Sequence, residues 1–332
     1  MRKKLTVIML ILTILMSFIL TGCNSEPLLI VFLGDSIAEA IAGMSPLSER
    51  ERYGYYGLIG SRNEYEFKNR AVSGHQTKDL LALLKQEDKD ARMMQTVVRN
   101  ADIIHISILG NDLLLNDLGE IIYSVAKDDF SFLDSIIEES VENFAEIVSV
   151  LRGYNKDAVI MFQNVYNPVF LNCDLINEKT RENLDSIGVT ESEYREYAGI
   201  ILSKLNGIIS DYLKEHPGEF YIIDSQAGFE SVYQKDHEFG ESLIFCDCIH
   251  PSNAGHAVLA DLTQAKLEEL GLADKKTALK NYKEIRKEQL KRLYNDSVNV
   301  KEVSRQIDKA KDCSEVTEIY FKAIADKKPA YC

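Results

Sequence analysis

Basic residues are scarce in this sequence relative to acidic ones. The 332 residues include 38 Lys and Arg against 52 Asp and Glu, which gives a formal net charge of −14. The deficit lies in residues 23–274, whose formal charge is −23, because residues 275–332 hold 15 Lys and Arg against 9 Asp and Glu. Nucleic-acid binding depends on basic groups that neutralise phosphates, so a body this acidic argues against DNA or RNA as a partner.

A second long apolar segment is also missing. Nothing after Cys23 is long and apolar enough to span a bilayer again, and the chain contains no internal repeat or low-complexity stretch. With 45% hydrophobic and 27% charged residues, the chain can bury a large core. These properties exclude a disordered chain and a bundle of membrane helices, and they favour one large domain with or without a small appendage.

The one long apolar run, Leu5 to Leu20, follows a basic start and is typical of an export signal. It ends in "LTGC", Leu20 to Cys23, which resembles the bacterial lipobox, where cleavage leaves a lipid-bearing cysteine at the new N-terminus. An uncleaved transmembrane anchor is less favoured, because the apolar span is short and small residues precede Cys23. We therefore expect a signal peptide over residues 1–22, lipid on Cys23, and an extracytoplasmic protein anchored to a bacterial cell membrane.

Cysteine is present but sparse. With Cys23 lipidated, five of the 6 cysteines remain, which permit at most two disulfides and one free thiol outside the cell. Their pairing stays open, with Cys313 and Cys332 the favoured pair. Two further cysteines and a histidine lie close together within residues 246–250, but structural zinc normally takes four ligands and no second cluster supplies the rest. We expect no metal site.

Short apolar runs rich in β-branched or aromatic residues alternate with segments of helical periodicity. Their nearly continuous hydrophobicity suits strands that are buried on both faces. The expected strands lie at 28–33, 65–72, 102–109, 158–165 and 220–224, and two clear helical patterns span 135–151 and 197–213. The alternation predicts an α/β/α three-layer sandwich around a five-stranded parallel sheet, over a domain from 23 to 274.

After residue 274 the pattern changes to helices alone. The spacing of apolar residues predicts three helices at roughly 275–295, 300–312 and 315–326, which form a helical extension over residues 275–332. This basic extension docks on the acidic body, docks on anionic lipid, or presents a solvated helical face. The sequence does not decide among these alternatives.

The stretch "GDSIAEAI" places a serine where the first strand hands over to a helix. In open α/β sheets ligands bind at such junctions, so Ser36 is a candidate nucleophile, although Asp and Ser are also ordinary helix caps. A nucleophilic serine needs a base and the base needs an orienting partner. Asp247 and His250 in "CDCIHPSNAGH" are three residues apart, so one turn of chain can join carboxylate and imidazole.

Acyl transfer also needs hydrogen-bond donors that face the developing oxyanion, and two loops can supply them. Gly74 follows the second expected strand and can offer a backbone N–H without a side chain that blocks approach. Asn111 follows the third and can offer its amide. Each residue also has a purely structural interpretation, Gly74 as a turn glycine and Asn111 as a helix cap.

Ser36, Gly74, Asn111 and His250, in this order after successive strands, resemble the blocks of the SGNH hydrolase superfamily, also called the GDSL lipase/acylhydrolase family. The resemblance implies a flavodoxin-like fold and ester hydrolysis without a cofactor. It also implies the triad Ser36, His250 and Asp247, and an oxyanion hole formed by the Ser36 and Gly74 N–H groups with the Asn111 amide. The family often has glycine where this chain has Leu109, a departure that can alter the loop before Asn111.

The substrate expected from the resemblance is an ester-bearing small molecule, glycan or lipid. Extracellular members of such families remove acetyl groups from carbohydrates, which we prefer, or cleave lysophospholipids and other lipid esters. A binding lipoprotein that has lost catalysis is a further alternative, since a fold does not fix a function. The weakly periodic stretch 167–189 is either a lid over the cleft or a plain surface connection.

Overall fold

The computed structural model describes residues 26–41, 49–170 and 175–327. The predicted signal peptide and the predicted lipidation site Cys23 lie outside these ranges. None of the helices in the described ranges combines the length and the hydropathy that a membrane crossing requires.

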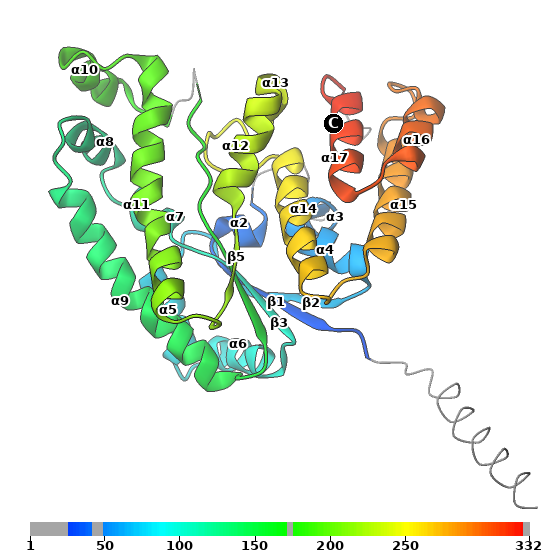
Figure 1. Cartoon of the computed structure of the whole chain (residues 1–332), viewed down its shortest axis with the longest axis horizontal. Helices are drawn as coiled ribbons and strands as arrows, with labels where there is room; N and C mark the ends of the chain where they lie inside the picture. The colour runs from blue at the N-terminus through cyan, green and yellow to red at the C-terminus, as the bar shows by residue number, and fades with distance from the viewer. Residues whose placement is uncertain (1–25, 42–48, 171–174, 328–332) are drawn as a thin grey trace, which may run out of the picture.

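Five parallel strands form one sheet in the order β2-β1-β3-β4-β5. Figure 1 shows the sheet with helices around it. The strands are β1 (Leu29–Gly34), β2 (Glu66–Asn69), β3 (Ile103–Ser107), β4 (Val159–Gln163) and β5 (Tyr221–Ile223). Each overlaps one predicted run, which confirms the five-stranded parallel sheet. This order is that of flavodoxin-like sheets, in which ligands bind where β1 and β3 end.

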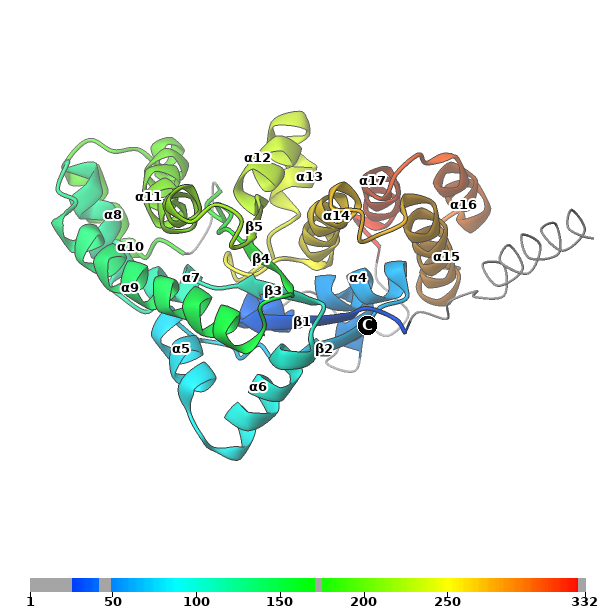
Figure 2. The ribbon, with the colours of Figure 1, turned by 60° about the horizontal axis from the view of Figure 1, so that its bottom comes forward.

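Alternate side chains of β1 enter two separate cores. Val31 and Leu33 face one helical layer, whereas Ile30 and Phe32 face the other. Helices therefore cover both faces, as Figure 2 shows with α5, α6 and α9 on one side of the sheet and α4 and α14 on the other. Burial on both faces is why these strands are almost continuously hydrophobic.

The helices divide between the two layers. The first layer contains α5 (Thr77–Lys85), α6 (Lys89–Asn100), α7 (Gly110–Leu114), α8 (Leu118–Ala126), α9 (Ser131–Tyr154), α10 (Glu178–Ser186), the short 3-10 helix η2 (Glu191–Glu193) and α11 (Tyr194–Glu215). The second contains α2 (Ser36–Glu39), α3 (Arg50–Tyr53), α4 (Tyr55–Asn63), α12 (Ser225–Lys235), α13 (His237–Glu241) and α14 (Asn253–Glu269).

The three predicted C-terminal helices are present as α15 (Lys275–Leu293), α16 (Val300–Lys309) and α17 (Cys313–Ile324). Of these, α15 lies beside α4 and α17 beside α14, and α16 packs against α15 and α17 (Figure 1). Beneath them Arg62 of α4 pairs with Asp261 of α14 at 2.7 Å, and the Arg62 guanidinium lies 3.6 Å from the centre of the Tyr282 ring of α15. The predicted boundary at residue 274 stays a prediction, and the hydrophobic core of the second layer continues across it.

Three cysteines within the described residues are free thiols, namely Cys246, Cys248 and the buried Cys313. Cys173 and Cys332 lie outside the described residues. The predicted pair of Cys313 with Cys332 therefore falls partly outside them as well.

Candidate active site

A sharp turn at the end of β1 presents Ser36. Gly34 has φ +121°, and a Cβ at this position would lie 1.8 Å from the carbonyl oxygen of Ser107 on β3, so only glycine fits. Asp35 then caps α2, because its carboxylate accepts a hydrogen bond from the Ile37 N–H at 3.0 Å. Ser36 is the first residue of α2, where backbone N–H groups have no partner inside the helix.

His250 and Asp247 reach Ser36 from the loop that precedes α14. The Nε2 atom of His250 lies 2.8 Å from the Oγ atom of Ser36, and its Nδ1 atom lies 2.8 Å from Oδ2 of Asp247. The loop is held at its base, where the Phe245 N–H donates to the His250 carbonyl at 2.8 Å. The predicted triad residues, 214 positions apart at the extremes, thus form one hydrogen-bonded line.

The two carboxylate oxygens of Asp247 have different hydrogen-bond partners. Oδ1 accepts from the backbone N–H groups of Ile249 and His250 at 3.1 and 3.0 Å, which fixes the loop, while Oδ2 faces the imidazole. Partial burial is the largest single influence on this carboxyl and raises its pKa, but the hydrogen bonds together hold the pKa of Asp247 below its usual value. Asp247 therefore stays ionised beside His250.

Gly74 and Asn111 lie on adjoining loops at the same sheet edge. The His75 N–H donates to the Val72 carbonyl at 3.2 Å, and Gly74 completes this turn with φ +82°. No described atom lies within 4 Å of the place where a Gly74 Cβ would be, so its backbone faces open space. The Asn111 amide donates to the His75 carbonyl at 3.0 Å, which ties the two loops together and leaves its second N–H for another acceptor.

Leu109, which stands where the family often has glycine, adopts a backbone conformation typical of glycine. Leu109 has φ +93°, a left-handed conformation that favours glycine, and it is fully buried. It also occupies the cap position of α7, so Asn111 is the second helical residue and not a cap. Asp112 holds this helix in place, because its Oδ1 atom accepts a hydrogen bond from the Thr77 hydroxyl at 2.5 Å. The loop keeps a glycine-like conformation without the glycine.

Sequence reasoning missed the buried environment of Asp35, because a helix-capping Asp attracts no attention in a sequence. It is only 3% exposed, and burial raises its pKa to about 7 despite hydrogen bonds from the Ile37 and Ala38 N–H groups and from Ser107. A titratable group thus lies directly before the candidate nucleophile.

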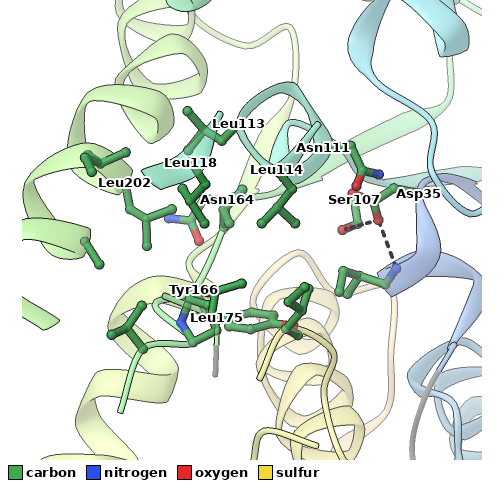
Figure 3. Close-up of a pocket in the computed structure, with 18 of the residues that line it drawn as sticks. Asp35, Ser107, Asn111, Leu113, Leu114, Leu118, Asn164, Tyr166, Leu175 and Leu202 are labelled. Atoms are coloured by element: carbon green, nitrogen blue, oxygen red, sulfur yellow. Dashed lines mark hydrogen bonds between the residues drawn. The ribbon is translucent and has the colours of Figure 1, made fainter. Parts of the chain in front are cut away.

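A cavity of about 90 Å³ opens beside Ser36. Figure 3 shows Asp35, Ser107 and Asn111 together at one end, with Leu118 and Leu202 toward the other. Most of the remaining lining is aliphatic, with Ile122 and Leu113 from α8 and α7, Ile201 from α11, and Pro168, Val169 and Leu175. The last three belong to the described part of the stretch 167–189, which therefore contributes to a wall of the cavity.

The fold and the site define an α/β/α protein with the side-chain set of a serine hydrolase at the carboxyl edge of its sheet. The chain belongs to the family of GDSL-like lipases and acylhydrolases, whose model matches residues 30–263. Membership supports ester hydrolysis of the esterase or lipase type.

Solved structures share this fold. A lipase, Lip_vut3, from a goat rumen metagenome is 21% identical, with a TM-score of 0.50 over 72% of this chain and 96% of that one. Phospholipase A1 from Streptomyces albidoflavus NA297 is 19% identical, with a TM-score of 0.52 over 73% and 100% of the two chains. The uncharacterized protein YpmR of Bacillus subtilis (strain 168) is 24% identical over 180 residues, 52% of this chain and 65% of that protein. The chain thus spans less than two thirds of this relative.

Proposed function

We propose that this protein is a serine ester hydrolase with Ser36 as its nucleophile. The observation that carries the proposal is the line from Ser36 through His250 to Asp247, with both contacts at 2.8 Å. As Ser36 Oγ attacks an ester carbonyl, His250 Nε2 accepts its proton, and the ionised Asp247 holds the proton on Nδ1 and stabilises the imidazolium. His250 then gives the proton to the leaving alcohol.

Oxyanion stabilisation is assigned to three donors. The Ser36 N–H lies at the N-terminus of α2, the Gly74 N–H lies in an open turn, and Asn111 has an amide N–H beyond the one bound to His75. Such preorganised donors stabilise the charge that develops in the tetrahedral intermediate. Water then attacks the acyl-enzyme with His250 as general base, and no step requires a metal or an organic cofactor.

The cavity favours an acyl chain of several carbons over acetyl. Beyond the polar residues beside Ser36, its walls are mostly aliphatic as far as Ile122 and Leu202, and burying methylene groups there stabilises a bound chain by about 0.8 kcal/mol each. An acetyl group fills only the end beside Ser36. Lipid-type esters are therefore the proposed substrates, ahead of the acetylated carbohydrates that the sequence alone led us to prefer.

Exchange of Ser36 for alanine tests the reaction. Ser36→Ala is expected to lower kcat/KM on p-nitrophenyl esters by at least about 10³-fold, with an unchanged melting temperature. Ser186→Ala, an exposed serine at the end of α10, is the matched control. Wild-type protein that neither hydrolyses esters of two to sixteen carbons nor labels with a fluorophosphonate would instead support the non-catalytic binding lipoprotein.

The site of action is proposed from the sequence. Cleavage before Cys23 and lipidation of its thiol would tether the enzyme outside the cytoplasm, at a surface rich in lipid esters. Wild type is expected to incorporate radiolabelled palmitate in a bacterial host, and Cys23→Ser is expected not to. Equal labelling of wild type and Cys23→Ser, or no labelling of wild type, would contradict lipid anchoring at Cys23.

A further inference from the structure

A polar row crosses the carboxyl end of the sheet beneath the candidate nucleophile. Gly34, Ser107 and Gln163 are paired in register on β1, β3 and β4. The Gln163 amide donates to Ser107 Oγ at 3.4 Å, and Ser107 donates to Asp35 at 3.4 Å. The Gln163 side chain therefore bends back from β4 toward Ser36 and not toward the far end of the cavity.

Gln163 is the one member of this row with an unmet hydrogen-bonding group. It is 2% exposed and lines the cavity, and its Oε1 atom has no hydrogen-bond partner within the described part of the chain. Buried polar atoms are rarely left unpaired, because their lost hydration is not replaced. If the amide is rotated, its NH₂ group becomes the unmet one, so either orientation leaves one polar atom for a ligand.

The position of Gln163 defines which part of an acyl chain it meets. Neighbouring strands are about 4.8 Å apart, so the Cα atom of Gln163, two strands away, lies roughly 10 Å from that of Gly34. The Gln163 side chain points back toward β1 and so shortens the distance to Ser36. An acyl group bound to Ser36 that enters the cavity passes Gln163 with its first carbons. Beyond this row the walls are mostly aliphatic, with Asn164 and Tyr166 as the exceptions.

We infer that Gln163 selects acyl groups that carry a hydroxyl on one of the first carbons after the carbonyl. This inference rests on the proposed ester hydrolysis at Ser36. A hydroxyl both donates and accepts, so it satisfies Gln163 in either amide orientation, whereas an unsubstituted chain leaves one polar atom of the amide buried without a partner. A site built to hydrogen-bond a substrate hydroxyl discriminates strongly against the analogue that lacks it.

Paired substrates test this selectivity. We would measure kcat/KM for p-nitrophenyl butyrate and its 2-hydroxy and 3-hydroxy counterparts with wild type, Gln163→Met and, as a control from the same cavity, Leu202→Met. Wild type is expected to prefer one hydroxy ester over butyrate by about 10-fold or more. Gln163→Met is expected to reduce this ratio to near 1, whereas Leu202→Met keeps it. A wild-type ratio near 1, or a ratio that Gln163→Met does not change, would overturn the inference.

A binding measurement separates this inference from the proposed function. With Ser36→Ala, thermal shifts by 2-hydroxybutyrate, 3-hydroxybutyrate and butyrate report on the cavity without turnover. If wild type hydrolyses no ester, the proposed function fails, yet a larger shift by one hydroxy acid that Gln163→Met abolishes still supports the subsite. Equal shifts by all three acids would overturn it. Gln163→Leu replaces Gln163→Met in both assays if the methionine variant does not fold.

Discussion

Asp35 and Asp261 are both buried carboxyl groups, 3% and 7% exposed, but their surroundings differ. Asp261, beneath the C-terminal helices, has the Arg62 guanidinium at 2.7 Å, and Tyr282 covers that guanidinium. Asp35, beside Ser36, is stabilised by backbone N–H groups and the Ser107 hydroxyl, with no salt bridge to a basic side chain within the described residues. The Asp261 carboxylate therefore has an ion-pair partner, whereas the Asp35 carboxylate has only hydrogen-bond donors.

The backbone also differs between the candidate site and the C-terminal helices. Two non-glycine residues beside the site, Leu109 and Cys248, have φ of +93° and +60°, whereas residues 275–327 contain no non-glycine residue with positive φ. Strained conformations persist where the surrounding structure forces them, and they concentrate at functional sites. Two of the five non-glycine residues with positive φ in the described ranges thus lie in the loops that carry Asn111 and His250.

The largest effect is expected from breaking the paired charge. Arg62→Met leaves Asp261 buried without its partner, so the free energy of unfolding should fall by about 3–5 kcal/mol in urea titrations. Arg62→Met/Asp261→Leu removes both charges and should recover much of the loss. Arg305→Met, which breaks an exposed ion pair with Glu302 at 2.8 Å, should change stability little. If the Arg62→Met variant is as stable as wild type, the ion pair does not stabilise Asp261, and Asp261 does not differ from Asp35 in this respect.

The buried Asp35 carboxyl, which has no salt bridge within the described residues, predicts a pH dependence of stability. Because the pKa of Asp35 is raised to about 7, the native protein binds more protons than the unfolded chain between its ordinary pKa of 3.8 and 7. The contribution of Asp35 to stability is therefore complete below pH 4 and lost as the pH rises through 7. Asp35→Asn keeps an oxygen for the Ile37 N–H but cannot ionise. Relative to wild type it should gain about 2–4 kcal/mol between pH 4 and pH 8.

Unfolding curves of wild type and Asp35→Asn at both pH values measure this gain. Asp261→Asn is the comparison, because it loses a favourable ion pair and should be less stable than wild type at pH 8. A constant difference between Asp35→Asn and wild type across this pH range would show that Asp35 titrates normally and is not the unpaired counterpart of Asp261.

The sequence alone allowed predictions wherever a short stretch of chain carries a pattern of its own. The strands followed from continuous hydrophobic runs, and Ser36, Asp247 and His250 were proposed from two short motifs and the needs of a nucleophile. Packing of side chains from distant elements was not predictable. Periodicity cannot show that Tyr282 covers Arg62, more than 200 residues earlier in the chain, or that the apolar residues of α8 and α11 line a cavity instead of filling the core. Gln163, inside an apolar strand pattern, carries no signal until its partners are known.

The smallest effect concerns the strained backbone between Asp247 and His250. Cys248 has φ +60°, and glycine at this position relieves about 1–2 kcal/mol of left-handed backbone strain in the folded protein. Glycine also raises the conformational entropy of the unfolded chain, which lowers the free energy of unfolding by about 0.5–1 kcal/mol. Cys248→Gly should therefore be as stable as wild type or up to about 1 kcal/mol more stable, and Cys248→Val, with a β-branched side chain, about 1 kcal/mol less stable. Cys246, two residues earlier without positive φ, should show the reverse order, because glycine there relieves nothing. If guanidinium unfolding ranks the variants identically at both cysteines, the strain at Cys248 has no energetic consequence, and the contrast rests on the buried charges alone.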